Sequence, residues 1–226
     1  MLILGVDTSG KNGSIALVEC EPGKHRTLDV TPLDGGTFSA QLVPQISQLL
    51  QSHNFTKNEI DAFAVVSGPG SFTGLRVGLA AIKALAEILR KPIAAVSLLE
   101  AVAVAGGIQG RVLTALDAGR GGIYCGEYAV TTIGTKLVSQ QLLNSEEFLA
   151  FASVAQVVTP DARIAELLRE KDLLVTQIDF PKADAIARIG FEKIRASEVV
   201  SPDALDANYI RRSDATLKKP SGAYQP

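Results

Sequence analysis

The sequence predicts an α/β protein built from two similar halves. Residues 2–6 form an apolar strand pattern that ends at Asp7, and a turn then leads into a second strand. Residues 112–116 repeat this arrangement, and placing Asp117 on Asp7 aligns the two strand–turn–strand units without a gap. Strands and helices follow each unit, which is typical of an internally duplicated α/β protein. The alternative is a chance match, because strand–turn–strand units are common.

The remaining elements follow from periodicity and turn chemistry. Helices are expected where apolar residues recur every three or four positions, and strands where short apolar runs lie between turn residues. In the first half we expect helices over 39–51, 56–59 (opened by a capping box) and 74–90, and strands over 14–18, 62–66 and 93–96. In the second half we expect strands over 112–117, 123–128, 157–158 and 173–178, and helices over 145–151, 159–171 and 183–196.

Length and composition limit the class of protein. The 226 residues are 46% hydrophobic, which is enough to bury one large domain or two small ones. We place the first lobe at 1–104 and the second at 105–226, with a polar C-terminal tail whose last segment can pack back on the first lobe. The net charge of −2 gives no domain-wide basic field for holding nucleic acid, so tRNA is expected only through a complex.

The sequence also indicates the cellular compartment. Cys20 and Cys125 form no disulfide framework, which indicates a reducing compartment. The N-terminus lacks a basic segment and meets Asp7 too early for a signal peptide. No apolar run approaches the roughly 18 residues of a membrane span. We therefore expect a cytoplasmic protein with no membrane contact.

The most conspicuous motif is a glycine-rich loop between the strand at 62–66 and the helix at 74–90. Its glycines are Gly68, Gly70 and Gly74, but the lysine of a P-loop is missing and the spacing of a dinucleotide fingerprint fails. Pro69 also removes one backbone donor. Two interpretations remain open: a degenerate phosphate-binding loop working with Asp7, or a tight strand-to-helix connection. The spacing favours the connection.

Catalytic and metal-binding patterns are weak. Asp7 could orient water, hold a cation or cap its turn, and Asp117 has the same ambiguity. His25 and His53 lie in separate segments without a second ligand at metal spacing. The hydroxyls near the glycine loop have no histidine in a paired motif to activate them. We expect no catalytic residue, no metal site and no cofactor.

The helix at 74–90 is apolar on several faces and carries small residues. Such a helix is covered on more than one side, either by its own sheet and a partner or as a central buried helix. The helix at 39–51 adds a second apolar stripe. The residues that we expect at a partner surface are Leu42, Ile46, Leu75, Gly78, Ala81 and Ile82.

Three segments together resemble one known family. They are "LGVDTSGKNGSIAL" (4–17), "SGPGSFTGLRVGLAAIKALA" (67–86) and "ALDAGRGGIYCGEY" (115–128). They closely resemble the bacterial TsaB (YeaZ) family of tRNA threonylcarbamoyladenosine biosynthesis proteins, within the Gcp/TsaD-like group. "NYIRR" (208–212) is similar to the C-terminal Tyr-x-Arg element of that family. The match covers most of the chain.

The resemblance implies a duplicated actin-like ATPase or ribonuclease-H-like fold, with a mixed sheet and flanking helices in each lobe. It implies a non-catalytic subunit that binds the TsaD transferase and works with the TsaE ATPase. It also implies that the chain alone forms a homodimer through its N-terminal lobe. Where the family often has His-Ser or His-Thr, this chain has Phe38-Ser39. That departure argues against metal catalysis.

Two enzyme alternatives remain beside the scaffold. One is a kinase-like ATPase that uses Asp7, the glycine loop and Asp117. The short chain leaves little room for a full nucleotide pocket, which argues against it. The other is a glycoprotease of the M22 type, an older name for this family, and the lack of metal ligands argues strongly against it.

Overall fold

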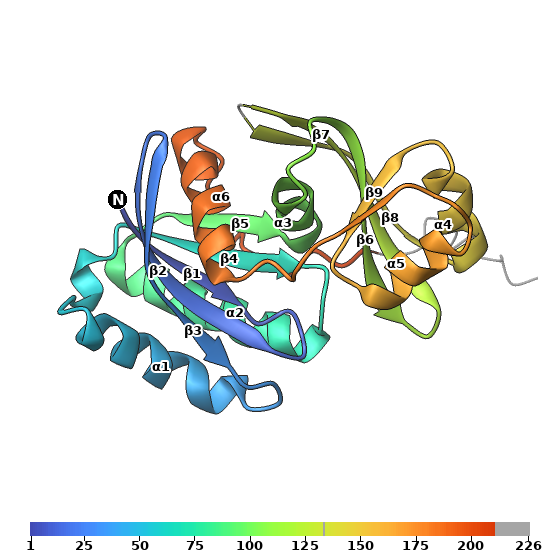
Figure 1. The fold of residues 1–226 in the computed structure, drawn as a ribbon. Helices are drawn as coiled ribbons and strands as arrows, with labels where there is room; N and C mark the ends of the chain where they lie inside the picture. Colours follow the sequence, from blue (N-terminus) through green and yellow to red (C-terminus); the bar gives the residue numbers. More distant parts are fainter. Residues whose placement is uncertain (133, 211–226) are drawn as a thin grey trace, which may run out of the picture.

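The computed structural model describes residues 1–132 and 134–210 and contains two five-stranded sheets (Figure 1). The first sheet has the order β3-β2-β1-β4-β5, in which β1 pairs antiparallel with β2 and parallel with β4. Its strands are β1 (Leu2–Asp7), β2 (Gly13–Glu21), β3 (Lys24–Leu33), β4 (Ala62–Gly68) and β5 (Ile93–Ser97).

The second sheet repeats this topology as β8-β7-β6-β9-β10. Its strands are β6 (Gly110–Gly119), β7 (Gly122–Thr131), β8 (Gly134–Leu143), β9 (Gln156–Thr159) and β10 (Val175–Gln177). The register shifts at matching places, between Leu17 and Val18 and between Glu127 and Tyr128. These pairs are separated by the same interval as Asp7 and Asp117. The predicted duplication and fold class are confirmed.

Two helices cover one face of each sheet. In the first lobe, α1 (Phe38–Ser52) packs on β2 and β3, and α2 (Phe72–Leu89) packs on β1 and β4. A short 3₁₀ turn, η1 (Lys57–Glu59), opens with the predicted capping box of Thr56 and Glu59. In the second lobe, α4 (Ser145–Ala152) and α5 (Ala162–Arg169) take the corresponding places.

The remaining helix of each half packs on the sheet of the other half. α3 (Leu98–Ala105) follows β5 but lies on β6 and β7, whereas α6 (Ala183–Arg195) follows β10 but lies across the first sheet (Figure 1). α6 approaches that sheet closely, since a Cβ atom on Gly5 would lie 2.1 Å from the carbonyl oxygen of Ala183. This exchange joins the two lobes.

The exchange also shapes the hydrophobic core. One large cluster fills both faces of the first sheet and continues through α3 to Leu116 and Tyr128 of the second. A smaller, separate cluster around Phe148 lies under α4 and α5. The expected boundary between residues 104 and 105 falls in the last turn of α3.

Three elements escaped the sequence analysis: β3, β8 and α3. β3 and β8 are edge strands, and each carries a bulge that interrupts the alternation of apolar residues, at Leu28 and Val138. α3 is short and, apart from Glu100, apolar because it lies between the lobes, so its pattern has no single apolar face.

One helix start was wrong. We expected a helix from Thr159, but Thr159 ends β9 and Asp161 is the residue before α5. The Thr159 hydroxyl donates to the carbonyl oxygen of Ala115 at 2.8 Å, which fixes it to the sheet. The polar tail, including the end of the "NYIRR" element, lies outside the described residues. In the part of the chain that is described, no helix combines the length and the apolarity needed to cross a membrane.

Candidate functional site

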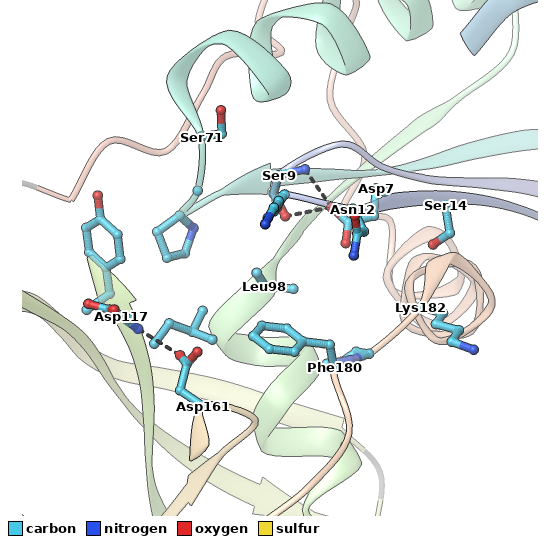
Figure 2. Close-up of a pocket in the computed structure, with 18 of the residues that line it drawn as sticks. Asp7, Ser9, Asn12, Ser14, Ser71, Leu98, Asp117, Asp161, Phe180 and Lys182 are labelled. Carbon is cyan, nitrogen blue, oxygen red and sulfur yellow. Dashed lines mark hydrogen bonds between the residues drawn. The ribbon is translucent and has the colours of Figure 1, made fainter. Parts of the chain in front are cut away.

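A cleft of about 720 Å³ lies between the lobes. The turn after β1 and the turn after β6 face each other across it, and the glycine loop and the segment before α6 complete its walls. Figure 2 shows Asp7 and Ser9 on one side, Asp117 and Asp161 on the other, and Phe180 at the entry to α6. The cleft thus brings together Asp7, Gly70 and Asp117 from distant parts of the sequence.

The hydrogen bonds of Asp7 lie within its own turn. Its Oδ1 accepts hydrogen bonds from the backbone N–H of Ser9 at 2.8 Å and from the Ser9 hydroxyl at 2.6 Å. The carboxyl group is buried, and this burial raises its pKa above the ordinary value. Of the roles open to Asp7 in the sequence, the geometry supports the capping of its own turn.

Asp117 repeats the arrangement in the second lobe. Its Oδ1 accepts from the backbone N–H of Gly119 at 2.9 Å, two residues ahead, as Asp7 does with Ser9. Arg163 donates to the same oxygen at 3.0 Å. Both copies of the duplicated motif therefore use the aspartate to close a turn.

Asp161 is a site residue that the sequence analysis missed. Its Oδ2 accepts from the backbone N–H of Asp117 at 2.8 Å. Burial raises the pKa of Asp161, and the nearby Asp117 carboxylate adds to that rise. The only sequence signal was its place after β9, which corresponds to the place of the glycine loop after β4.

The glycine loop packs directly on the turn after β1. A Cβ atom added to Gly70 would lie 2.5 Å from the carbonyl oxygen of Ser9. A Cβ atom added to Gly74 would lie 2.1 Å from the carbonyl oxygen of Thr8, and one added to Gly78, in the next turn of α2, would lie 2.3 Å from the Thr8 hydroxyl. The backbone N–H of Ser71 donates to the Ser9 carbonyl oxygen at 2.6 Å. These glycines therefore allow two backbone segments to touch, which supports the interpretation as a tight connection.

Gly68 has a different role from the other glycines of the loop. Its φ of +133° is accessible mainly to glycine, and an added Cβ atom would lie 2.7 Å from the carbonyl oxygen of Asn208. Gly68 is thus the point at which the C-terminal segment crosses the end of β4.

The charges in the cleft suit a phosphate poorly. Asp7, Asp117 and Asp161 line it, with Lys11 and Lys182 exposed at its margin. Much of the remaining wall is apolar, including Leu98, Leu116, Tyr124 and Phe180. Among residues 1–132 and 134–210, no group of three His, Cys, Asp or Glu side chains is placed to hold a metal ion.

The expected partner residues lie mostly inside the first lobe. Five of the six, Leu42, Ile46, Leu75, Gly78 and Ile82, are buried in the chain's own core, and Ala81 is half-buried. They face the sheet because α1 and α2 pack on each other and on β1 to β4. The exposed face of α2 consists instead of Phe72, Thr73, Arg76, Ala80, Ala84, Glu87 and Ile88.

Comparison with known proteins places the chain in a family. Residues 35–198 match the family model "TsaD: tRNA N6-adenosine threonylcarbamoyltransferase". The tRNA threonylcarbamoyladenosine biosynthesis protein TsaB of Bacillus subtilis is 33% identical over 129 residues, which cover 57% of this chain and 55% of that protein. TsaB of Haemophilus influenzae is 25% identical over 237 residues, covering 98% of each chain.

A solved structure agrees with the observed fold. YeaZ from Pseudomonas aeruginosa superposes with a TM-score of 0.76 at 24% identity, covering 92% of this chain and 99% of that one. The resemblance found in the sequence is thus confirmed over nearly the whole chain. The chain belongs to the family described by the TsaD tRNA N6-adenosine threonylcarbamoyltransferase model, and within it is similar to the TsaB (YeaZ) proteins.

Proposed function

We propose that this chain is a non-catalytic subunit needed for the formation of threonylcarbamoyladenosine in tRNA. The observation that carries the proposal is the full-length similarity to a TsaB protein. The site supports the non-catalytic part, because both aspartates close their own turns and the glycine loop is packed against one of them. The proposed place of action is the cytoplasm.

The proposed main partner is a TsaD-like paralogue, with a TsaE-like ATPase joining the complex. The exposed face of α2 is the surface that we assign to the paralogue. Ile88 is 72% exposed on it, and Ala80 and Ala84 leave the helix backbone accessible to a second helix. Exposed apolar faces next to small residues commonly mark protein interfaces. In the absence of the paralogue, the same face is proposed to form a homodimer, so the two assemblies exclude each other.

The experiment is a pair of matched charge substitutions. Ala84→Glu puts a carboxylate on the exposed face of α2, and Ala150→Glu puts one on an exposed position of α4 in the second lobe. We expect Ala84→Glu to weaken binding of the paralogue at least 100-fold by calorimetry and to remove the homodimer in ultracentrifugation. Ala150→Glu should change neither. Equal affinity for both variants would show that the partner surface lies elsewhere.

Reconstitution tests the function itself. Modified adenosine should form in tRNA only when this chain is added to the paralogue, the ATPase and a supply of an activated threonylcarbamoyl donor. Loss of product with Ala84→Glu and its retention with Ala150→Glu would support the scaffold role. Micromolar binding of Mg-ATP by this chain alone, removed by Asp7→Ala, would instead favour the kinase-like alternative.

A further inference from the structure

The C-terminal segment Ala207–Ile210 connects the two lobes at the end of β4. The backbone N–H of Asn208 donates to the carbonyl oxygen of Ser67 at 2.7 Å. The side chains of Asn208 and Gln140 exchange two hydrogen bonds, at 3.1 and 3.2 Å. Since Gln140 belongs to β8 and Ser67 to β4, Asn208 ties the edge of the second sheet to the start of the glycine loop.

The next residue, Tyr209, reaches the first turn of α2. Its ring lies 5.5 Å from the ring of Phe72, and its hydroxyl accepts a hydrogen bond from Arg76 Nε at 3.3 Å. The Arg76 guanidinium carbon lies 3.6 Å from the centre of the Phe72 ring. We call these three residues the aromatic cluster. Phe72 is 54% exposed and Tyr209 40% exposed, although each contacts the others.

The aromatic cluster has the composition of an interface centre. Tyrosine and arginine are enriched among the residues that contribute most to binding between proteins. Mutual stacking orders the three side chains before any partner arrives, which lowers the entropy lost on binding. Phe72 and Arg76 are four residues apart on α2, and Ala80 follows at the same spacing. The cluster is therefore continuous with the exposed face of α2.

We propose that the aromatic cluster is a protein-binding site that extends the partner surface of α2, and that Asn208 positions it. The proposal rests on the proposed function, and the occupant is the same paralogous chain. The guanidinium of Arg76 stacks on one face of Phe72 and donates to Tyr209, and the cluster continues into the uncharged part of the α2 face at Ala80, Ala84 and Ile88. A protein partner fits these features better than an RNA, which needs phosphate contacts and stacking faces.

A pair of phenylalanine variants tests the binding site. Phe72 and Phe180 are the same residue type with similar exposure, 54% and 52%, but Phe180 lines the cleft. We expect Phe72→Ala and Tyr209→Ala to weaken binding of the paralogue at least tenfold, and Phe180→Ala to weaken it less than twofold. All three should keep the circular dichroism spectrum of the parent. Equal affinities for Phe72→Ala and Phe180→Ala would overturn the proposal.

The positioning role of Asn208 is tested by measurements that a general loss of stability would not reproduce. Gln140→Ala and Asn208→Ala should each weaken binding severalfold, and the double variant should be no weaker than Asn208→Ala, because the two side chains act through one contact. Amide exchange should rise over 68–76 and stay unchanged in α5. Additive losses, or unchanged exchange over 68–76, would overturn the positioning role.

The outcomes of these measurements distinguish a failure of this proposal from a failure of the proposed function. If Ala84→Glu leaves paralogue binding intact, the partner surface on α2 fails together with its extension. If Ala84→Glu abolishes binding but Phe72→Ala does not weaken it, only the extension fails. Salt-sensitive binding of tRNA by the isolated chain that disappears in Phe72→Ala, with paralogue affinity unchanged, would assign the cluster to RNA and overturn the proposal.

Discussion

The two lobes share their strand order and their aspartate turns, yet they differ in the helices that cover them. α1 and α2 span 15 and 18 residues, whereas α4 and α5 span 8 each. α1 and α2 each bury one face in the large core, and α2 also has an exposed face. The comparison shows that the first lobe carries more helix than its sheet needs for cover, and the exposed face of α2 is the surface that we propose for a partner.

The junctions between sheet and helix differ in a second way. In the first lobe, Gly70 and Gly74 let the loop backbone touch the turn after β1. In the second lobe, the Asp161 side chain spans the corresponding gap and accepts from the backbone of Asp117. The same turn is therefore supported by backbone contact in one lobe and by a carboxylate in the other. Substitutions at the two junctions should have different consequences.

The largest expected effect comes from the two cores. Phe63 and Phe148 are both fully buried, and replacing either with alanine should cost about 3–5 kcal/mol of unfolding free energy. Phe63→Ala should lower amide protection throughout, because its cluster runs through both lobes. Phe148→Ala should lower protection mainly in α4 and α5. An equal loss in α2 and α6 for both variants would mean that the lobes open as one unit.

The glycine junction should tolerate change poorly. Gly74→Ala places a methyl group against the Thr8 carbonyl oxygen, and we expect a loss of about 2 kcal/mol, or roughly 4–8 °C in Tm. Gly122→Ala is the control in the second lobe. Its nearest neighbour, at 3.2 Å, is the end of the Leu142 side chain, which can move. Calorimetric melting of both variants gives the comparison, and equal Tm values would contradict the close packing.

The stability of the junction at Asp161 should depend on its hydrogen-bond acceptor rather than on its negative charge. Asp161→Ala leaves the Asp117 N–H without its partner and should cost about 1 kcal/mol. Asp161→Asn keeps an acceptor and removes a carboxylate whose pKa is raised by burial, so it should be as stable as the parent or more stable at pH 7. Chemical denaturation measures both, and a larger loss for asparagine than for alanine would refute this role.

Replacement of the two turn aspartates should have different effects on stability. The pKa of Asp7 in the folded protein is raised by burial above 3.8, so the folded state holds its proton longer than the unfolded state. Stability from this group therefore falls as pH rises from about 3.8 through the folded pKa. Asp7→Asn should remove that fall and be more stable at pH 7. Asp117→Asn should change stability by less than about 0.5 kcal/mol, because the Arg163 pair is exposed.

Denaturation across pH 3 to 7 checks this pair of variants. If the unfolding free energies of the parent and of Asp7→Asn change with pH in parallel, burial of Asp7 does not control the loss of stability above pH 3.8. A change of more than about 0.5 kcal/mol at pH 7 for Asp117→Asn would contradict the small contribution expected of the Arg163 pair.

Local signals predicted much of the fold. The duplication followed from the matching positions of Asp7 and Asp117, and most helices and central strands followed from periodicity. The edge strands β3 and β8 could not be found in this way, because bulges at Leu28 and Val138 interrupt their alternation. Asp161 could not be recognised either, since its partner Asp117 is 44 residues away.

By itself the sequence determined most helices, the central strands, the repeat and the turns, since spacing, capping and turn preferences act between neighbouring residues. Only the tertiary structure decided that α3 and α6 exchange lobes and that Gly74 touches Thr8. It also decided that Leu75 and Ile82 face the core whereas Phe72 and Ile88 face outward. A helix that is apolar on several sides does not specify which side its own sheet will cover, because that choice depends on packing between segments far apart in the chain.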